Sequence, residues 1–378
     1  MSKNFVRGKT PVFFLADGQI EMICPNPDHR AFEEFFPGVP YVLAFVRGHS
    51  KILLSKLLHK DGTADFKEAI KLLSSAQQVE DIEAIRKDMT IKNLLPPGGK
   101  ISLFGPSGGG VLAQQYLAKY GGNVSKVMLE VTGAPDLSRR RGISFIRDLR
   151  DYDPSVALEF ELLMRKAFRS REELSYMLFN LGRMNMNGSK DLKNLLKDLN
   201  AGKTLQYSNN LLKPVFNLGS LVRRLSFPEK IGVKVRLYEL FGEELRRYIK
   251  ANRRPFNLVY EWTSFCLNDF LAAERTGQIE RVTFLFNRSS FAGEALIIAG
   301  TEDVVFSPKV SELLFKEYKH CKVALLKDGH GLEKNEKLLS GLRSSFLRSG
   351  LDSVVFNRVL QDSRFHVMEK GKKPSIIN

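Results

Sequence analysis

One serine of the sequence stands in a pattern that can support nucleophilic chemistry. The segment Gly105–Gly109 reads G-x-S-x-G, with the apolar run Ile101–Phe104 before it and the helical pattern Leu112–Tyr120 after it. Such a motif holds the serine on a sharp turn between a strand and a helix, where side chains in place of the glycines would collide. The amide of Gly108 and the helix N-terminus then favour negative charge on a reacting oxygen. We therefore predict that Ser107 is a nucleophile and that Gly108 belongs to its oxyanion hole.

A nucleophilic serine needs a base, and the base needs an acid that orients it. His330 lies between two glycines, just after the apolar run Val323–Leu326, where a loop at the end of a strand would begin. Asp303 lies just past a second apolar run, Ala295–Ala299. The order serine, acid, histidine is one in which such triads occur along a chain. We predict that His330 is the base and Asp303 the acid for Ser107.

Other residues compete for these two roles. Only three of the six histidines follow Ser107, and of the other two His320 precedes its strand and His366 lies in the tail. Glu302 is the near alternative to Asp303 as the acid, and Asp136 is the more distant one.

Elements that would position these residues recur along the chain as short apolar runs followed by helical patterns such as Glu80–Met89. Continuous apolar runs, without alternation, are typical of a parallel sheet that is buried on both faces. The pattern predicts an α/β fold with a mostly parallel, doubly wound sheet. The six strands that we expect are Val12–Leu15, Tyr41–Val46, Ile101–Phe104, Val127–Val131, Ala295–Ala299 and Val323–Leu326.

The strand pattern stops after Pro135 and returns only near residue 286. Between them the sequence is mostly helical, and the expected helices include Ser155–Arg169, Glu172–Leu181 and Gly242–Ala251. We predict a core of residues 1–134 and 286–378 with an inserted helical domain of residues 135–285. The run Arg139–Arg141 opens this insertion, and the sequence predicts a basic cap.

The composition favours a globular protein with an excess of positive charge. The 378 residues include 58 Lys and Arg against 42 Asp and Glu, a formal net charge of +16, which favours an acidic partner or an anionic surface for the basic cap. The three cysteines, Cys24, Cys266 and Cys321, are far apart in sequence, so we expect neither a disulfide framework nor a zinc site. No apolar run is long enough to cross a membrane. We expect a cytoplasmic protein that needs no metal or organic cofactor.

Several segments together resemble the proline iminopeptidase-like branch of the α/β hydrolases, the family of the prolyl aminopeptidases. The resemblance covers most of the chain outside the insertion and implies the α/β-hydrolase fold with a helical cap over the active site. It rests on Pro40–Phe45 with Arg47–Ser50, Asp81–Arg86, Gly105–Gly109, Gly300–Asp303 and Gly329–His330.

The resemblance also implies roles for residues outside the predicted triad. A second oxyanion donor would come from the loop after the first strand, Ala16–Gln19, through the amide of Gly18 or Gln19. Asp17, in the same loop, would oppose an oxyanion if its side chain pointed inward. Aminopeptidases of this branch hold the free amine of the substrate with carboxylates of the cap. Glu261, followed by Trp262, is a candidate for this binding role.

The sequence leaves three other functions open beside an aminopeptidase. A carboxylesterase or lipase-like hydrolase would use the same residues to cleave an ester through an acyl-enzyme. A non-catalytic, hydrolase-like binding protein would use the basic cap for an acidic partner, and Asp17 is its best support. An NAD(P)-binding protein would place a dinucleotide on Gly108-x-Gly110-x-x-Ala113, with Glu130 on the ribose.

Overall fold

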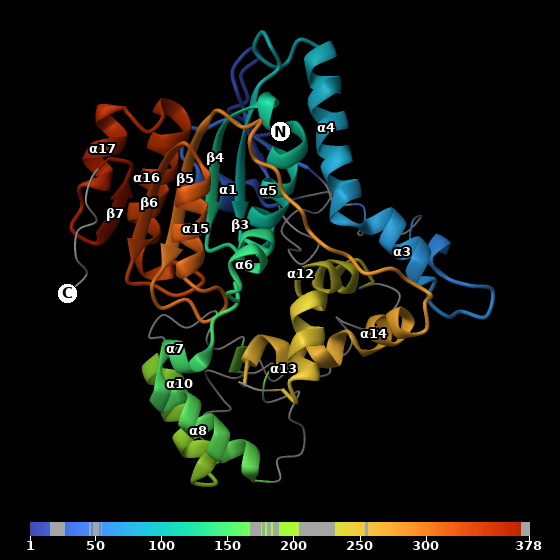
Figure 1. Cartoon of the computed structure of the whole chain (residues 1–378). Helices are drawn as coiled ribbons and strands as arrows, with labels where there is room; N and C mark the ends of the chain where they lie inside the picture. Colours follow the sequence, from blue (N-terminus) through green and yellow to red (C-terminus); the bar gives the residue numbers. More distant parts are fainter. Residues whose placement is uncertain are drawn as a thin grey trace.

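The computed structural model describes residues 1–15, 27–44, 47, 53, 55–166, 175, 178–179, 183, 189–203, 231–253 and 256–371. Its centre is a seven-stranded sheet with the order β2-β1-β3-β4-β5-β6-β7 (Figure 1). Neighbouring strands are parallel except β6 and β7, which pair antiparallel. The strands are β1 Val12–Phe14, β2 Tyr41–Leu43, β3 Ile101–Pro106, β4 Val124–Glu130, β5 Glu294–Gly300, β6 His320–Leu326 and β7 Phe365–Glu369.

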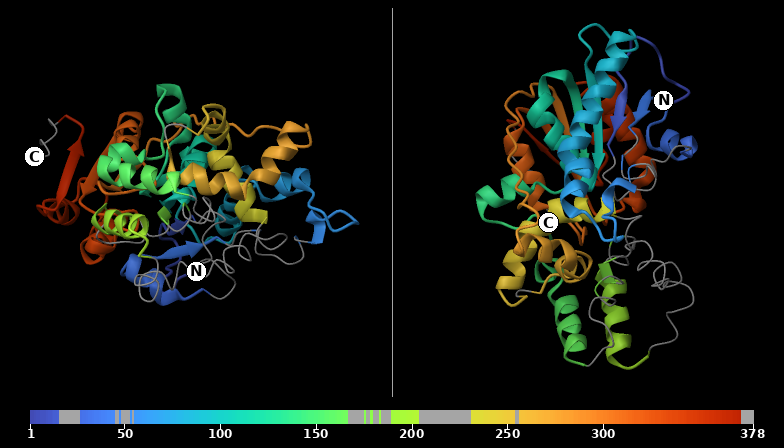
Figure 2. Two further views of the ribbon diagram at one scale, coloured as in Figure 1. Left: turned by 90° about the horizontal axis from the view of Figure 1, so that it is seen from below. Right: turned by 90° about the vertical axis from the view of Figure 1, so that its right-hand side faces the viewer.

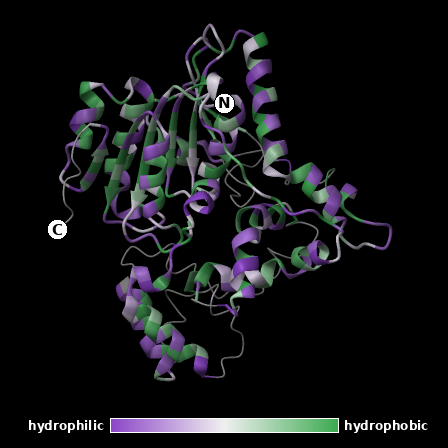
Figure 3. Ribbon diagram, viewed as in Figure 1, coloured by the Kyte–Doolittle hydropathy of each residue, from purple (hydrophilic) through white to green (hydrophobic). Residues whose placement is uncertain are grey.

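Each face of the sheet packs against its own hydrophobic core. Phe13 and Leu103 point into the core with α4 (Ser75–Ile91) and α5 (Gly108–Tyr120). Their chain neighbours Phe14 and Phe104 point into the core with α1 (His29–Phe35), α16 (Glu336–Ser349) and α17 (Val354–Leu360). Burial on both faces explains why the strands read as continuous apolar runs. Figure 3 shows hydrophobic residues concentrated on the central strands. The helices of the core are α1 His29–Phe35, α3 Phe66–Leu73, α4 Ser75–Ile91, α5 Gly108–Tyr120, α15 Lys309–Glu317, α16 Glu336–Ser349 and α17 Val354–Leu360.

The segment between β4 and β5 is helical in its described part. Figures 1 and 2 show it beneath the sheet, on the side toward which the parallel strands point. Its helices are α6 Pro135–Arg141, α7 Leu149–Tyr152, α8 Pro154–Arg165, α10 Ser189–Asn200, α12 Ile231–Lys250, α13 Leu258–Cys266 and α14 Asn268–Arg275. The division of the chain into core and cap stays a prediction.

Local sequence signals explain where several helices begin. The side chains of Asp65 and Ser74 accept hydrogen bonds from the first turns of α3 and α4, and Asp153 does the same for α8, which has proline at its first position. Asn257 caps α13 through the amides of residues 259 and 260. These are side chains that favour helix N-termini, since they satisfy amides without an intrahelical partner.

Two differences from the sequence prediction concern elements. Strand β7 was not predicted, because Phe365–Glu369 is short, lies at the sheet edge and pairs antiparallel. Helix α12 begins at Ile231, eleven residues before the predicted start at Gly242. All six predicted strands are present with shifted ends, but residues 45 and 46 lie outside the described residues, as does most of Glu172–Leu181.

Candidate active site

Ser107 occupies a strained turn between β3 and α5. Its backbone angles are φ 53° and ψ −126°, a conformation that residues other than glycine rarely adopt. The Ser107 amide donates to the Glu130 carbonyl at 2.9 Å, which fixes the turn against the end of β4. A residue keeps an unfavourable backbone conformation only where the surrounding structure fixes it, and such conformations are common at functional sites.

Close backbone contacts explain the glycines around Ser107. A side chain at Gly105 would meet the Gly109 carbonyl oxygen at 2.5 Å, across the turn. A side chain at Gly109 would collide with the carbonyl of Leu15, the residue after β1, and one at Gly110 with the hydroxyl of Thr132. The glycine at position 109 is therefore required by the neighbouring strand, and not by the turn itself as the motif suggested.

The three residues of the predicted triad lie within hydrogen-bonding distance of one another. His330 Nε2 is 3.1 Å from Ser107 Oγ, and His330 Nδ1 is 2.9 Å from Asp303 Oδ2. With Nδ1 protonated and donating to Asp303, Nε2 is free to accept the serine proton. His330 and Asp303 are both buried, at 8% and 2% exposure, so water competes little for these contacts. The arrangement can activate the serine hydroxyl as a nucleophile.

Backbone hydrogen bonds join the loop that carries the acid to the loop that carries the base. The Thr301 amide donates to the Leu326 carbonyl and the Glu302 amide to the Asp328 carbonyl, both at 2.9 Å. Asp303 Oδ1 accepts from the amides of Val305 and Phe306 at 2.7 and 3.2 Å, which leaves Oδ2 for His330. The acid and the base are thus held in register by the ends of β5 and β6.

The two alternative acids have other partners. Glu302 pairs with Lys334 at 2.9 Å. Asp136 is buried and accepts two hydrogen bonds of 2.8 Å from the guanidinium of Arg288. Among the three candidates, Asp303 is therefore the carboxylate that contacts His330.

The strand order, the serine turn after β3 and the acid and base loops after β5 and β6 together decide the fold class. The chain has the α/β-hydrolase fold. This confirms the fold that the sequence predicted. The branch within that fold stays open.

Comparisons with known proteins find structural likeness at low sequence identity. No protein-family model and no curated protein matches the sequence. An esterase from Exiguobacterium antarcticum is similar at 15% identity and a TM-score of 0.42, over 91% of this chain and 94% of that chain. A putative non-heme bromoperoxidase from Mycobacterium tuberculosis has 14% identity and a TM-score of 0.43, over 90% and 93%. An esterase from a Rhodococcus species has 14% identity and a TM-score of 0.42, over 91% and 92%.

The predicted oxyanion hole is described only in part. Gly108 is the first residue of α5, where an amide has no partner within the helix. Ser107 contributes the carbonyl of the peptide group that carries this amide, and that carbonyl accepts from the Thr132 hydroxyl at 2.8 Å. Gly18 and Gln19 lie outside the described residues, as does Asp17.

Two arginines of the segment between β4 and β5 donate to backbone carbonyls in the segments that carry the site residues, and neither contact was predicted from the sequence. Arg236 on α12 is fully buried and donates to the Gly108 carbonyl at 3.2 Å. Arg147 donates to the carbonyls of Thr301 and Asp303 at 2.7 and 3.0 Å. Contacts from a side chain to a distant backbone carbonyl leave no pattern in the sequence.

The predicted amine-binding residues lie inside α13. Glu261 is fully buried and accepts from the Tyr248 hydroxyl at 2.6 Å and from Arg253 at 3.2 Å. Trp262 is buried against the ring of Phe179, with ring centroids 4.8 Å apart. A substrate amine would have to replace Arg253 beside Glu261, and the binding role of this pair stays a prediction.

The carboxylate that a dinucleotide would need is engaged by another side chain. Glu130 is buried and forms two hydrogen bonds, of 2.7 and 3.0 Å, with the guanidinium of Arg343 on α16. Burial raises the pKa of Glu130, and the Arg343 charge opposes this shift. Both carboxylate oxygens of Glu130 already accept hydrogen bonds from Arg343, so Glu130 is poorly placed to bind a ribose hydroxyl.

Within the part of the chain that the structure describes, no three His, Cys, Asp or Glu side chains converge so as to hold a metal ion. None of the helices in the described ranges combines the length and the apolar character of a membrane span.

Proposed function

We propose that the protein is a serine hydrolase that cleaves an amide or ester bond through an acyl-enzyme. The observation that carries the proposal is the contact series from Ser107 to His330 to Asp303, with the serine on a strained turn. Each member has a partner suited to its role: the serine meets a base, and the base meets a buried carboxylate.

In the proposed mechanism Ser107 Oγ attacks the substrate carbonyl while His330 Nε2 takes the hydroxyl proton. Asp303 holds the imidazole through Nδ1 and stabilises its cation. His330 then gives the proton to the leaving amine or alcohol, and the bond to that group breaks. A water molecule, deprotonated by the same nitrogen, then attacks the carbonyl carbon of the acyl-enzyme. The bond from that carbon to Ser107 Oγ breaks, His330 returns the proton to Oγ, and the acid is released. The Gly108 amide donates to the oxyanion in both steps, and Gly18 or Gln19 is the proposed second donor.

The substrate class depends on the helical segment between β4 and β5, for which we propose the role of a cap. A proline iminopeptidase-like activity would use Glu261 to hold a free amine, and Arg253 would have to yield that place. A carboxylesterase activity needs no such exchange. We therefore propose both bond types as substrates to be assayed side by side, with aminoacyl p-nitroanilides and p-nitrophenyl esters of short acids.

Labelling by a fluorophosphonate probe tests the proposal, because the probe reacts only with an activated serine. We expect the wild type to be labelled and Ser107→Ala and His330→Ala to be unlabelled. With any substrate that is turned over, we expect both changes to reduce kcat by roughly 10⁴-fold or more.

Matched controls separate the triad from general surface chemistry. Ser289→Ala and His320→Ala change an exposed serine and an exposed histidine and should leave labelling unchanged. Labelling of Ser107→Ala at the wild-type rate would show that Ser107 is not the nucleophile. If the folded wild type is not labelled, the non-catalytic binding protein becomes the better hypothesis, with Asp17 as the first residue to change.

A further inference from the structure

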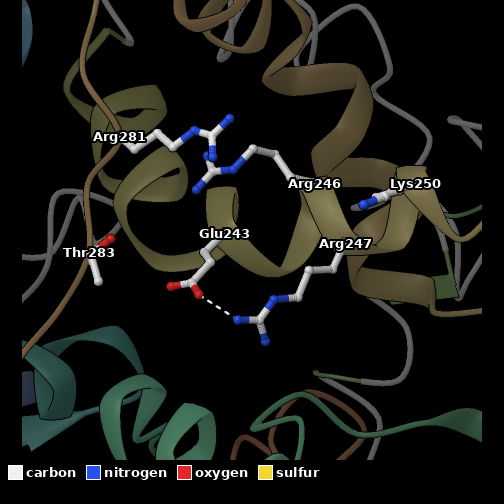
Figure 4. Close-up of a pocket in the computed structure, with 6 residues that line it drawn as sticks. All are labelled: Glu243, Arg246, Arg247, Lys250, Arg281 and Thr283. Carbon is white, nitrogen blue, oxygen red and sulfur yellow. Dashed lines mark hydrogen bonds and ion pairs between the residues drawn. The ribbon is translucent and has the colours of Figure 1, made fainter.

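A cationic pocket lies at the C-terminal half of α12, in the segment between β4 and β5. It has a volume of about 440 Å³. Figure 4 shows its side chains, which come from α12 and from the extended segment that leads back to β5. The lining residues are Glu243, Arg246, Arg247, Lys250, Arg281 and Thr283.

Positive charge exceeds negative charge in and around this pocket. Glu274 is shared by Arg246 at 2.6 Å and Arg281 at 2.9 Å. Glu243 is shared by two further arginines, Arg247 at 2.6 Å and Arg139 at 3.6 Å. Lys250 has no ion pair among the residues that the structure describes. Five cations therefore lie near three carboxyl groups, those of Glu243, Glu274 and Glu244, which is close enough to Arg247 to feel its charge. Part of the positive charge is uncompensated.

The pocket combines one largely buried cation with more exposed ones. Arg246 is 21% exposed and Glu274 only 6%, so this guanidinium is fixed at the wall of the pocket. The side chains of Arg247 and Arg281 are 60% and 72% exposed and can turn toward a ligand. Guanidinium groups donate paired hydrogen bonds that match phosphate oxygens, and several of them on one cavity suit several adjacent phosphates.

We propose that this pocket binds closely spaced phosphate groups, as in a ligand that carries a di- or triphosphate. Among the described residues, none that lines the pocket contacts Ser107, His330 or Asp303, so the proposed site is independent of the hydrolase function. The convergence of cations on one hollow favours a compact anion over a long nucleic acid, which would need a basic stripe.

Calorimetric titration with sodium tripolyphosphate at low salt tests the proposal. The variant Arg247→Ala/Lys250→Ala/Arg281→Ala removes three exposed cations and leaves Glu243 with Arg139 and Glu274 with Arg246, so the fold should persist. We expect binding by the wild type and at least about tenfold weaker binding by this variant.

The control variant Lys60→Ala/Lys316→Ala/Arg358→Ala removes the same charge from exposed positions elsewhere and should bind as the wild type does. A second arm uses sedimentation with vesicles of 95% phosphatidylcholine and 5% phosphatidylinositol bisphosphate. Binding in either arm that only the pocket variant loses supports the site and identifies a soluble or a lipid source of the phosphates. Absence of binding in both arms, or equal loss in the control variant, overturns it.

Discussion

At the scale of single residues, Thr132 acts on the same peptide group that carries the proposed oxyanion donor. Its hydroxyl donates to the Ser107 carbonyl at 2.8 Å, and the amide on the other side of that peptide group belongs to Gly108. The hydrogen bond fixes the peptide plane and polarises the amide. Thr132 is therefore a positioning residue in the proposed mechanism.

The change Thr132→Val removes this hydroxyl but keeps the shape of the side chain. We expect kcat to fall roughly tenfold with little change in KM, because the oxyanion is stabilised mainly in the transition state. Steady-state kinetics on the substrate that the profiling selects would measure both constants. Thr132→Ser keeps the donor and should restore kcat. Equal kcat for the valine and serine variants would exclude the role.

The proximity of Ser107, Asp303 and His330 was predictable, because it depends on their order and spacing along the chain. Ser107, Asp303 and His330 each follow an apolar run, and parallel strands bring such positions to one edge of a sheet. Thr132 was not predictable, because its contact depends on how β4 sits beside the serine turn. Glu302 and Asp303 are neighbours in sequence, and only the fold of their loop decides which one meets His330.

At the scale of elements, α12 connects the serine turn to other parts of the segment between β4 and β5. Arg236 contacts the Gly108 carbonyl, and two turns further along Glu244 accepts from the Ser144 hydroxyl at 2.9 Å. Burial raises the pKa of Glu244 to about 7, and the hydrogen bond from Ser144 and the charge of Arg247 only partly oppose the shift.

This pKa predicts how α12 responds to pH. The folded protein keeps the Glu244 proton up to about pH 7, whereas the unfolded chain releases it near 4.5. The stability that Glu244 contributes is therefore full below pH 4.5 and is lost as the pH rises through 7. Glu244→Gln stays neutral and can still accept from Ser144. We expect its free energy of unfolding to fall less than that of the wild type between pH 5 and 8.

Urea denaturation at several pH values measures this difference. Glu34→Gln, a change at an exposed carboxylate, serves as the control and should follow the wild-type dependence on pH. Parallel curves for the wild type and Glu244→Gln would show that Glu244 does not titrate in this range.

Elements were predictable where their pattern is long or strongly apolar. The buried strands β3 to β6 each contain a largely apolar run, and all four were predicted. The first half of α12 was missed because its apolar residues are interrupted by charged ones, including Arg236 and Glu239, which pair with each other inside the protein. Because charged residues are usually exposed, a buried ion pair makes a buried helix look in the sequence like one on the surface.

At the scale of the whole molecule, one buried ion pair joins the two ends of the segment between β4 and β5. Asp136 lies on α6, where this segment begins, and Arg288 lies just before β5, where it ends. Two hydrogen bonds of 2.8 Å connect them, and Arg288 also donates to Gln114 on α5 at 2.7 Å. The sequence predicted the insertion from the break in strand pattern. It did not predict the ion pair between Asp136 and Arg288, which are 152 positions apart in the sequence.

Because both partners are buried, the pair predicts an unequal response to single and double changes. Arg288→Met leaves the Asp136 carboxylate buried without its main partner, which should reduce the free energy of unfolding by about 3–5 kcal/mol. Adding Asp136→Leu removes the stranded charge and should recover much of that loss. The exposed surface pair of Arg364 and Asp362 is the control, and Arg364→Met should change the free energy of unfolding little. Urea denaturation of the wild type, Arg288→Met, the double variant and Arg364→Met measures these free energies of unfolding. If Arg288→Met reduces the free energy of unfolding no more than Arg364→Met does, this ion pair does not stabilise the contact between the sheet and the segment between β4 and β5.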